Sequence, residues 1–336
     1  TVIGFSHTHL SGTGIGDLFD ITVMPVVGDG LTYDRGQEDD QSSGLWSYAD
    51  RTRETARPGY YSVPLTRYGI TAELTATCRT GLHRYTFPES PKSGIVINLM
   101  DGGCWDRPMD TFIERADSRT GLPAEDGYAL RGYRFSRGWA DDQKVYFYAE
   151  FSKPFSSIDI LTDDIEIWED EFKRMPTYAH AHFSTAEGEQ ILMKVALSPV
   201  SMEGAYANMQ AEMPGWDFDA TAAEADRLWN EELGRIKVET ADHDAKKIFY
   251  TALYHTMIAP SVFCDADGSY RGADGKNHPD PGYVTSTTFS LWDTYRAAMP
   301  LYSIFQPERY EDFVNTMTAI CEEQGKLPVW HLHGCE

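Results

Sequence analysis

Apolar and polar residues alternate with a period of two through much of the segment from Thr71 to Ser198. The pattern is clearest at residues 71–78, where alanine, leucine and cysteine alternate with threonine and glutamate, and it recurs at 145–151 and 191–197. In an extended strand this spacing puts all apolar side chains on one face. Several such short strands, with no helical period among them, predict an antiparallel β-sandwich.

A tight turn is predicted after the first of these strands. Arg79-Thr80-Gly81 follows it, and residues 82–87 continue in an extended pattern. A short loop that contains glycine between two extended runs predicts a β-hairpin.

Near Asp217 the apolar spacing changes to steps of three and four residues, which predicts amphipathic helices. Four are expected: one over 219–236 with Asp219 as N-cap, one after Asp242, one over 289–299 ended by Pro300, and one from Pro307 to the stop at Gly325. The carboxyl third is therefore predicted to be all helix and loop.

These patterns predict an α+β protein of more than one domain, because 336 residues exceed the ~150 typical of one domain. We expect a β-sandwich domain over 1–216, a helical linker over 217–242 and the start of a helical domain over 243–336. Four helices would form only part of a large helical toroid, so we expect the toroid to be incomplete and the chain truncated. The alternative is a small helical appendage on the sandwich.

The charge balance excludes some partners. The chain has 29 Lys and Arg against 52 Asp and Glu, a formal charge of −23, so nucleic acid and anionic membrane surfaces are not expected to bind. The longest apolar runs are far shorter than the ~20 residues of a membrane-spanning helix. Aromatic residues make up 13% of the chain, which suits amphipathic ligands such as sugars.

Three pairs of histidines at a two-residue spacing are candidate metal ligands: His7/His9, His180/His182 and His331/His333. Each pair needs further ligands from elsewhere, and the alternative for each is a hydrogen-bonded structural histidine. The acidic loop from Asp265 to Gly275 fails as an EF-hand, because the sixth and twelfth positions hold Tyr270 and Lys276.

Two segments combine tryptophan with a carboxylate. Trp292 and Asp293 stand together at the start of a predicted helix, and Trp330, His331 and Glu336 follow the end of another. A carboxylate can accept two sugar hydroxyls while a ring covers the apolar face of the sugar. The alternative is that Asp293 only favours the helix amino terminus electrostatically.

Five strings in order along the chain resemble glycoside hydrolase family 92. They are GFSHTHLSGTG (4–14), PGYYSV (58–63), TAELT (71–75), FSLWDTYRA (289–297) and GKLPVW (325–330). The resemblance implies an exo-acting α-mannosidase with a β-sandwich followed by an (α/α)6 domain, a calcium ion, and hydrolysis with inversion. The implied partner is a mannose-containing oligosaccharide or N-glycan.

The resemblance also assigns residues. It implies that Trp292 and Asp293 contact the terminal mannose, and that Trp330, His331 and Glu336 form the pocket wall. The loop that contains His7, Ser11 and Gly12 is expected to reach into the cleft between domains.

The family's acid segment, Glu-Gly-Asn-x-Trp-Gln-Tyr, and its base segment, Gly-Asn-Asp-Asp, do not occur in these 336 residues. We therefore expect the catalytic acid, the base and the calcium ligands beyond residue 336, and assign none in this chain. Two other function classes remain as alternatives: a non-catalytic carbohydrate-binding protein, and a metal-dependent amide or phosphate hydrolase that uses His7 and His9.

The chain opens at Thr1 without a signal sequence, so any targeting segment is expected to have been removed or not included. Export is favoured over the cytoplasm because polymeric mannosides lie outside the cell.

Overall fold

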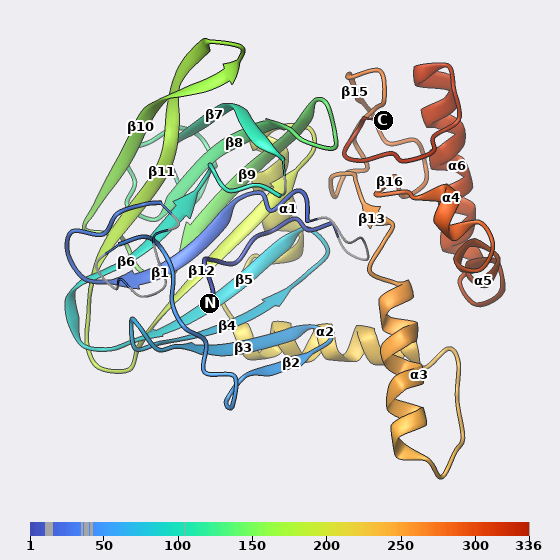
Figure 1. Cartoon of the computed structure of the whole chain (residues 1–336), viewed down its shortest axis with the longest axis horizontal. Helices are drawn as coiled ribbons and strands as arrows, with labels where there is room; N and C mark the ends of the chain where they lie inside the picture. The colour runs from blue at the N-terminus through green and yellow to red at the C-terminus, as the bar shows by residue number, and fades with distance from the viewer. Residues whose placement is uncertain (11–15, 35, 37–39, 41–42, 104, 336) are drawn as a thin grey trace.

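The computed structural model describes residues 1–10, 16–34, 36, 40, 43–103 and 105–335. The amino-terminal part is built from antiparallel strands and the carboxyl-terminal part mainly from helices, and the two lie side by side (Figure 1). This confirms the expected order of a β-sandwich followed by helices. Ser11, Gly12 and Glu336, which the resemblance assigns to the site, lie outside the described residues.

Two sheets form the sandwich, and every pair of neighbouring strands is antiparallel. The smaller sheet has the order β1 (Thr22–Val27), β6 (Ser90–Asn98), β11 (Glu171–Thr185), β10 (Ser157–Trp168). The larger has the order β2 (Thr55–Arg57), β3 (Tyr60–Leu65), β4 (Ile70–Ala76), β5 (Thr80–Phe87), β12 (Glu189–Ser198), β9 (Gln143–Phe151), β8 (Ala129–Arg137), β7 (Arg107–Ala116).

The main hydrophobic core lies between the two sheets. Ile95 and Ile97 of β6 face Phe147 of β9 and Ile191 and Val195 of β12, and all five are completely buried. Burial of this alternating face confirms the strands that the period of two predicted.

The first hairpin turns earlier than the sequence predicted. The loop is Thr77-Cys78-Arg79, and Gly81 lies inside β5. Thr77 donates its backbone N–H to the carbonyl of Thr80, and Glu212 accepts hydrogen bonds from the Thr77 hydroxyl (2.6 Å) and the Arg79 backbone N–H (2.8 Å). The carboxylate of Glu212, on a helix far away in the sequence, thus fixes the position of the turn. The position of Gly81 in the sequence could not predict this contact.

In the described part of the chain the helices are α1 (Met202–Glu212), α2 (Phe218–Leu233), α3 (His243–Thr256), α4 (Leu291–Thr294), α5 (Ala298–Phe305) and α6 (Pro307–Gln324). The predicted α3 and α6 are confirmed, with Asp242 as N-cap and Gly325 as a left-handed C-cap at φ 80°. For α2 the N-cap is Asp217, whose side chain accepts from the Ala220 N–H, so the assignment of Asp219 was wrong.

The expected helix over 289–299 is two short helices, α4 and α5. Pro300 does not end a helix; it occupies the third position of α5, where its missing N–H breaks no helical hydrogen bond. Ser290 is the N-cap of α4, and the Leu291 N–H donates to the carbonyl of Val329 at 3.0 Å. The backbone pairing with the segment after α6 therefore contributes to the conformation of residues 289–299, in addition to the spacing of their apolar side chains.

The carboxyl third also contains strands, so the prediction of helix and loop alone was wrong. β13 (Ser261–Val262) pairs with β16 (Ser286–Thr287), and β14 (Tyr270–Arg271) pairs with β15 (Asn277–His278). Two residues are too few to show a period of two.

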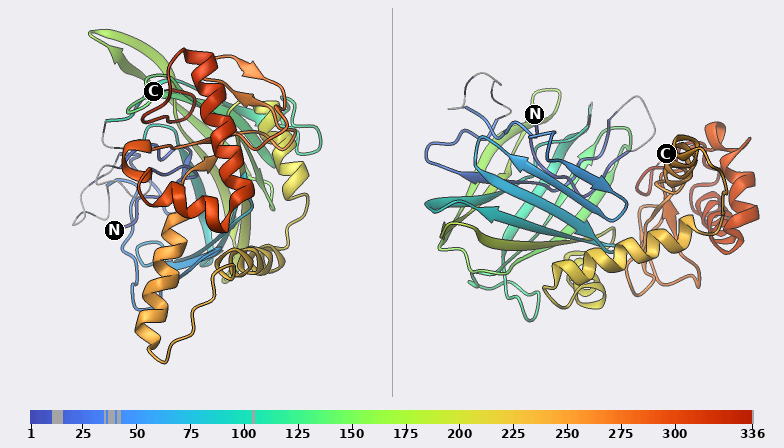
Figure 2. Two further views of the ribbon diagram at one scale, coloured as in Figure 1. Left: turned by 90° about the vertical axis from the view of Figure 1, so that its right-hand side faces the viewer. Right: turned by 90° about the horizontal axis from the view of Figure 1, so that it is seen from below.

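Helix α2 connects the two parts of the molecule (Figure 2). Its first half packs Phe218 and Ala222 on Leu82 of the larger sheet. In its second half the ring of Trp229 packs against the ring of Tyr254 on α3, with 4.8 Å between the ring centroids. Among the described residues, no helix has the length and apolarity that a membrane crossing requires.

Candidate functional site

Three tryptophan rings meet where the sandwich faces the helical part. Trp105 lies between β6 and β7, Trp139 between β8 and β9, and Trp330 follows α6. Trp139 and Trp330 have ring centroids 4.4 Å apart, and Trp139 stacks on Trp105 at 5.7 Å with an interplanar angle of 22°. Trp105 and Trp139 are 54% and 36% exposed. The cluster is therefore an aromatic surface open to solvent.

A hydrogen-bonded chain links this surface to Asp293. The Trp330 indole N–H donates to the Ser290 hydroxyl, and that hydroxyl donates to the Asp293 carboxylate at 2.5 Å. The backbone supports the arrangement, because Thr288 and Phe289 donate their N–H groups to the His331 carbonyl at 3.0 Å. Asp293 remains exposed to solvent. The structure thus brings together Trp330 and Asp293, two residues that the sequence singled out separately.

Two other expected site residues lie differently. The side chain of His331 is buried, with 2% of its surface exposed. Trp292 is 63% exposed, and no ring contact of it is found among the described residues. The structure does not bring Trp292 onto the ring cluster, so its contact with sugar stays a prediction.

A buried ion cluster supports the sandwich side of the aromatic surface. Arg134 donates to Asp20 at 2.7 Å and to Asp106, and all three side chains are almost fully buried. Asp106 also accepts from Ser136 at 2.6 Å, and it directly follows Trp105 in the chain. Charge pairing in a low dielectric fixes the backbone that carries Trp105.

Two backbone hydrogen bonds and a close approach at Gly138 fix the loop that carries Trp139. The Trp139 backbone N–H donates to Asp17 at 3.0 Å, and the Gly138 N–H donates to the Ala140 carbonyl. A Cβ at Gly138 would come within 2.8 Å of the Asp106 side chain. Only glycine permits this approach, so the turn brings the ring next to Trp105.

A cleft of about 710 Å³ lies between the sandwich and the helical part. His7, His9 and Arg79 line it from the sandwich, and Cys264 and His333 line it from the carboxyl-terminal part. His7 thus lies at the boundary between the two parts, whereas Trp292, Asp293, Trp330 and His331 do not line the cleft.

His7 is held in a chain of hydrogen bonds. Its Nδ1–H donates to the Ile21 carbonyl at 2.6 Å, so its Nε2 accepts from the His83 Nε2–H at 2.8 Å, and His83 Nδ1 accepts from the Tyr85 hydroxyl at 2.7 Å. Burial lowers the pKa of His7 to about 4, and burial lowers the pKa of His83 well below its usual range. Both rings are neutral at physiological pH.

The histidine pairs do not assemble metal sites in the described part of the chain. Both nitrogens of His7 are already hydrogen-bonded. His182 pairs with Asp159 at 2.8 Å, and His180 bonds to the Tyr33 hydroxyl at 2.9 Å. Within the described residues none of the three pairs belongs to a group of three convergent ligands. These findings weigh against a metal hydrolase built on His7 and His9.

Sequence reasoning missed Trp105 and Trp139. Each tryptophan follows glycine closely, in Gly102-Gly103 and in Gly138, on a connection between strands. That signal marks a turn with an exposed ring, but it does not show that the two turns meet. Together with Trp330 and Asp293, they form a stacking surface beside a carboxylate, an arrangement suited to a sugar ring.

Two family descriptions match the chain. The glycosyl hydrolase family 92 N-terminal domain matches residues 1–198, and the glycosyl hydrolase family 92 catalytic domain matches residues 204–336.

Solved structures and a curated protein are also similar. A family GH92 alpha-mannosidase from Bacteroides thetaiotaomicron is 34% identical at a TM-score of 0.89 over 99% of this chain and 45% of its own, and it has also been solved with mannoimidazole. An inverting family GH92 mannosidase from the same organism shares the fold, at 24% identity and a TM-score of 0.75 over 92% of this chain and 40% of its own. A protein of Arthroderma benhamiae described as an uncharacterized secreted glycosidase is 26% identical over 88% of this chain and 39% of its own length. The chain thus spans less than half the length of these relatives.

Proposed function

The chain belongs to glycoside hydrolase family 92, and on that premise we propose that the protein is an exo-acting glycosidase that removes terminal α-linked mannose with inversion. The proposal rests on the family and on one observation, the hydrogen-bonded connection of Trp330 through Ser290 to Asp293 beside Trp139. A carboxylate next to stacked rings offers hydroxyl acceptors and an apolar surface at once.

In this proposal Asp293 accepts hydroxyl hydrogen bonds from the terminal mannose. Ser290 directs one carboxylate oxygen, and the exposed position leaves the carboxylate open to a ligand. Trp330 forms the pocket wall, and Trp139 and Trp105 extend it onto the sandwich. Trp292, His331, His7, Ser11, Gly12 and Glu336 stay proposed site residues on the resemblance alone.

The proposed chemistry is a single displacement. One protonated carboxyl group donates to the glycosidic oxygen while a second carboxylate activates water on the opposite face, at a separation of ~6.5–9.5 Å. We assign neither group to residues 1–336. This chain would supply the sandwich and part of the substrate pocket.

Calcium is the proposed cofactor of the whole enzyme. Calcium takes six to eight oxygen ligands. Within the described residues the group of three convergent metal-ligating side chains includes a histidine, which does not fit that preference. In the Asp265–Gly275 loop the carboxylate of Asp265 already accepts from Asn208 and Ser198 at 2.8 Å. Neither this cluster nor the Asp265 carboxylate therefore fits a calcium site, and the proposed calcium ligands lie beyond residue 336.

The proposed substrates are mannose-containing oligosaccharides, N-glycans among them, and the proposed location is outside the cytoplasm. Two relatives support this: one solved mannosidase binds mannoimidazole, and the fungal relative is described as secreted. No nucleic-acid partner is proposed, since the net charge is −23.

The test is hydrolysis of an aryl α-mannoside by the purified protein, with the aryl β-mannoside as control and NMR assignment of the first-formed anomer. We expect turnover of the α-anomer alone and release of β-mannose. Binding of mannosides without turnover would overturn the enzyme proposal in favour of a carbohydrate-binding protein, and first release of α-mannose would overturn inversion.

A further inference from the structure

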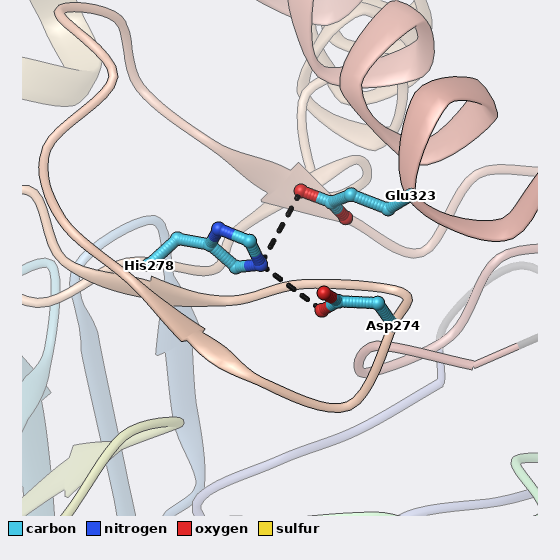
Figure 3. A group of neighbouring side chains, drawn as sticks. All are labelled: Asp274, His278 and Glu323. Carbon is cyan, nitrogen blue, oxygen red and sulfur yellow. Dashed lines mark hydrogen bonds and ion pairs between the residues drawn. The ribbon is translucent and has the colours of Figure 1, made fainter.

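Three ligand atoms of different residues converge away from the tryptophan surface. Asp274 and His278 belong to the β14–β15 hairpin, and Glu323 lies in the last turn of α6 (Figure 3). His278 Nε2 lies 3.0 Å from Asp274 Oδ1 and 3.9 Å from Glu323 Oε1, and the three ligand atoms all lie within 4.8 Å of one another. All three side chains are partly buried.

The hairpin geometry produces this convergence. Tyr270 pairs directly with His278, so both side chains point to one face, and their rings stack at 5.1 Å. Gly275, at φ 75°, closes the turn that returns the chain from Asp274 to His278. A Cβ on Gly272 would come within 2.7 Å of both Glu323 Oε2 and His278 Nε2. Glycine at that position lets the two ligands approach.

Separate contacts hold Glu323 in place. Its Oε1 accepts from the Tyr270 hydroxyl at 2.7 Å, and its Oε2 accepts from the Ala273 N–H at 2.7 Å. Each carboxylate oxygen can accept more than one bond, so these contacts leave capacity for a cation. Oriented donors of this kind are what fix the ligands of protein metal sites.

We propose that Asp274, His278 and Glu323 bind a Zn²⁺ ion. Zinc bonds to nitrogen and oxygen are ~2.0–2.2 Å long, which in a tetrahedron places ligand atoms about 3.4 Å apart. The two separations from His278 Nε2, 3.0 and 3.9 Å, fall on either side of that distance. The third separation, between the Asp274 and Glu323 carboxylates, is at most 4.8 Å, so the side chains would close in around the ion, with water as the fourth ligand.

The charges fit a divalent cation. Two carboxylates and a neutral imidazole carry the charge that Zn²⁺ neutralises. The site also lies at the carboxyl end of α6, whose last turn contains no basic residue, and a helix carboxyl end favours positive charge. The Lys276 ammonium, 3.3 Å from Asp274, is 78% exposed and can move into solvent.

The ion would fasten the hairpin to α6. The same hairpin carries Arg271, which donates to the side chain of Asp142 at 2.6 Å and to its carbonyl at 2.8 Å. Asp142 lies three residues from Trp139 in the same strand connection. The site is thus placed to stabilise the contact between the helical part and the tryptophan surface.

The test is zinc binding by the purified protein after EDTA treatment and removal of the chelator. Bound metal is counted by mass spectrometry after equilibration with Zn²⁺, and the change in melting temperature on adding Zn²⁺ is recorded. We expect His278→Gln and Glu323→Gln each to bind one zinc fewer per chain than the unmodified protein, and to lose most of the zinc-dependent rise in melting temperature. Because the readout is the response to zinc, loss of a hydrogen bond in the variants does not imitate the result.

The matched control is His182→Gln, which removes a histidine that pairs with a single carboxylate, Asp159, at 2.8 Å. It should bind as much zinc as the unmodified protein. Equal zinc content in His278→Gln and the unmodified protein would overturn the proposal and leave a hydrogen-bonded cluster. A His278-dependent response to Ca²⁺ but not to Zn²⁺ would also overturn it. Neither outcome bears on mannoside hydrolysis, which is measured separately.

Discussion

Trp139 of the sandwich and Trp330 of the helical part have ring centroids 4.4 Å apart, at an interplanar angle of 40°. The contact joins residues separated by almost 200 positions in the sequence, across the boundary between the two parts of the molecule. The rings also meet Trp105 on one side and, through Ser290, Asp293 on the other. The proposed sugar surface therefore depends on how the two parts are packed, and it should respond to changes in either.

Trp139→Ala should weaken mannoside binding more than it weakens the fold. Loss of the half-exposed ring removes about 50–80 Å² of apolar contact with a sugar, or about 1–2 kcal/mol. We expect KM to rise about 5- to 30-fold with little change in kcat. Trp168→Ala is the control, since Trp168 is a 44% exposed tryptophan at the end of β10. Equal kinetics in the two variants would contradict the placement of substrate at Trp139.

The sequence predicted the elements whose determinants are local. The alternating strands, the Asp242 cap of α3, and Pro307 and Gly325 at the two ends of α6 are confirmed. Helix α1 was missed because it packs with small residues, such as Ala205 against Ala196, so no broad apolar stripe shows in the sequence.

In the candidate site, too, only the residues that stand in a local sequence pattern could be predicted. Trp330 and Asp293 stand in recognisable strings, whereas the link between them is a single hydroxyl of Ser290. Trp105 and Trp139 reach the site only through the packing of two distant turns. Asp274, His278 and Glu323 were missed because a histidine on a two-residue strand and a glutamate on a helix share no motif.

Arg134→Met should destabilise the sandwich severely. The substitution leaves Asp20 and Asp106 buried without their counter-ion, which costs about 3–5 kcal/mol of unfolding free energy. Chemical denaturation measures this cost. Arg119→Met is the control, because Arg119 is 85% exposed in its pair with Asp117 and should change stability by less than about 1 kcal/mol. Similar losses in both variants would contradict a structural role for the buried cluster.

His7 should make stability depend on pH below neutrality. Burial lowers its pKa from 6.5 to about 4 in the folded protein, so between these values the unfolded chain binds the extra proton. The stabilising contribution is complete above pH 6.5 and is lost as the pH falls toward 4, by about 2–3 kcal/mol.

The variant His7→Asn cannot titrate, so the difference in unfolding free energy between it and the unmodified protein should shrink over this range. Denaturant titrations at pH 7.5, 5.5 and 4.5 measure the change. His243→Asn, at an exposed position at the start of α3, is measured beside it as the control for replacing a histidine side chain. A constant difference for His7→Asn would show that its ring titrates normally.

Removal of divalent ions by a chelator should abolish mannoside hydrolysis, and added Ca²⁺ should restore it. The expectation rests on the proposed calcium cofactor of the whole enzyme. EGTA removes zinc as well as calcium, so activity is measured after Ca²⁺ or Zn²⁺ is added back alone, with the metal content determined in the same samples. Restoration by Zn²⁺ but not Ca²⁺, or full activity in calcium-free protein, would contradict it.

Asp293→Ala should reduce catalysis without unfolding the protein. Charge-assisted hydrogen bonds to two hydroxyls contribute roughly 1.5–3 kcal/mol each, so we expect a loss of about 3–4 kcal/mol of transition-state binding, or roughly 10²- to 10³-fold in kcat/KM. Stability should change by less than about 1 kcal/mol, since the side chain is an exposed first-turn charge of α4. Ser290→Ala separates positioning from contact: it breaks the bonds to Trp330 and Asp293 but keeps the carboxylate, so its loss should be smaller. If kcat/KM of Asp293→Ala falls less than tenfold while stability drops, Asp293 is a helix-terminal charge and the mannose site lies elsewhere.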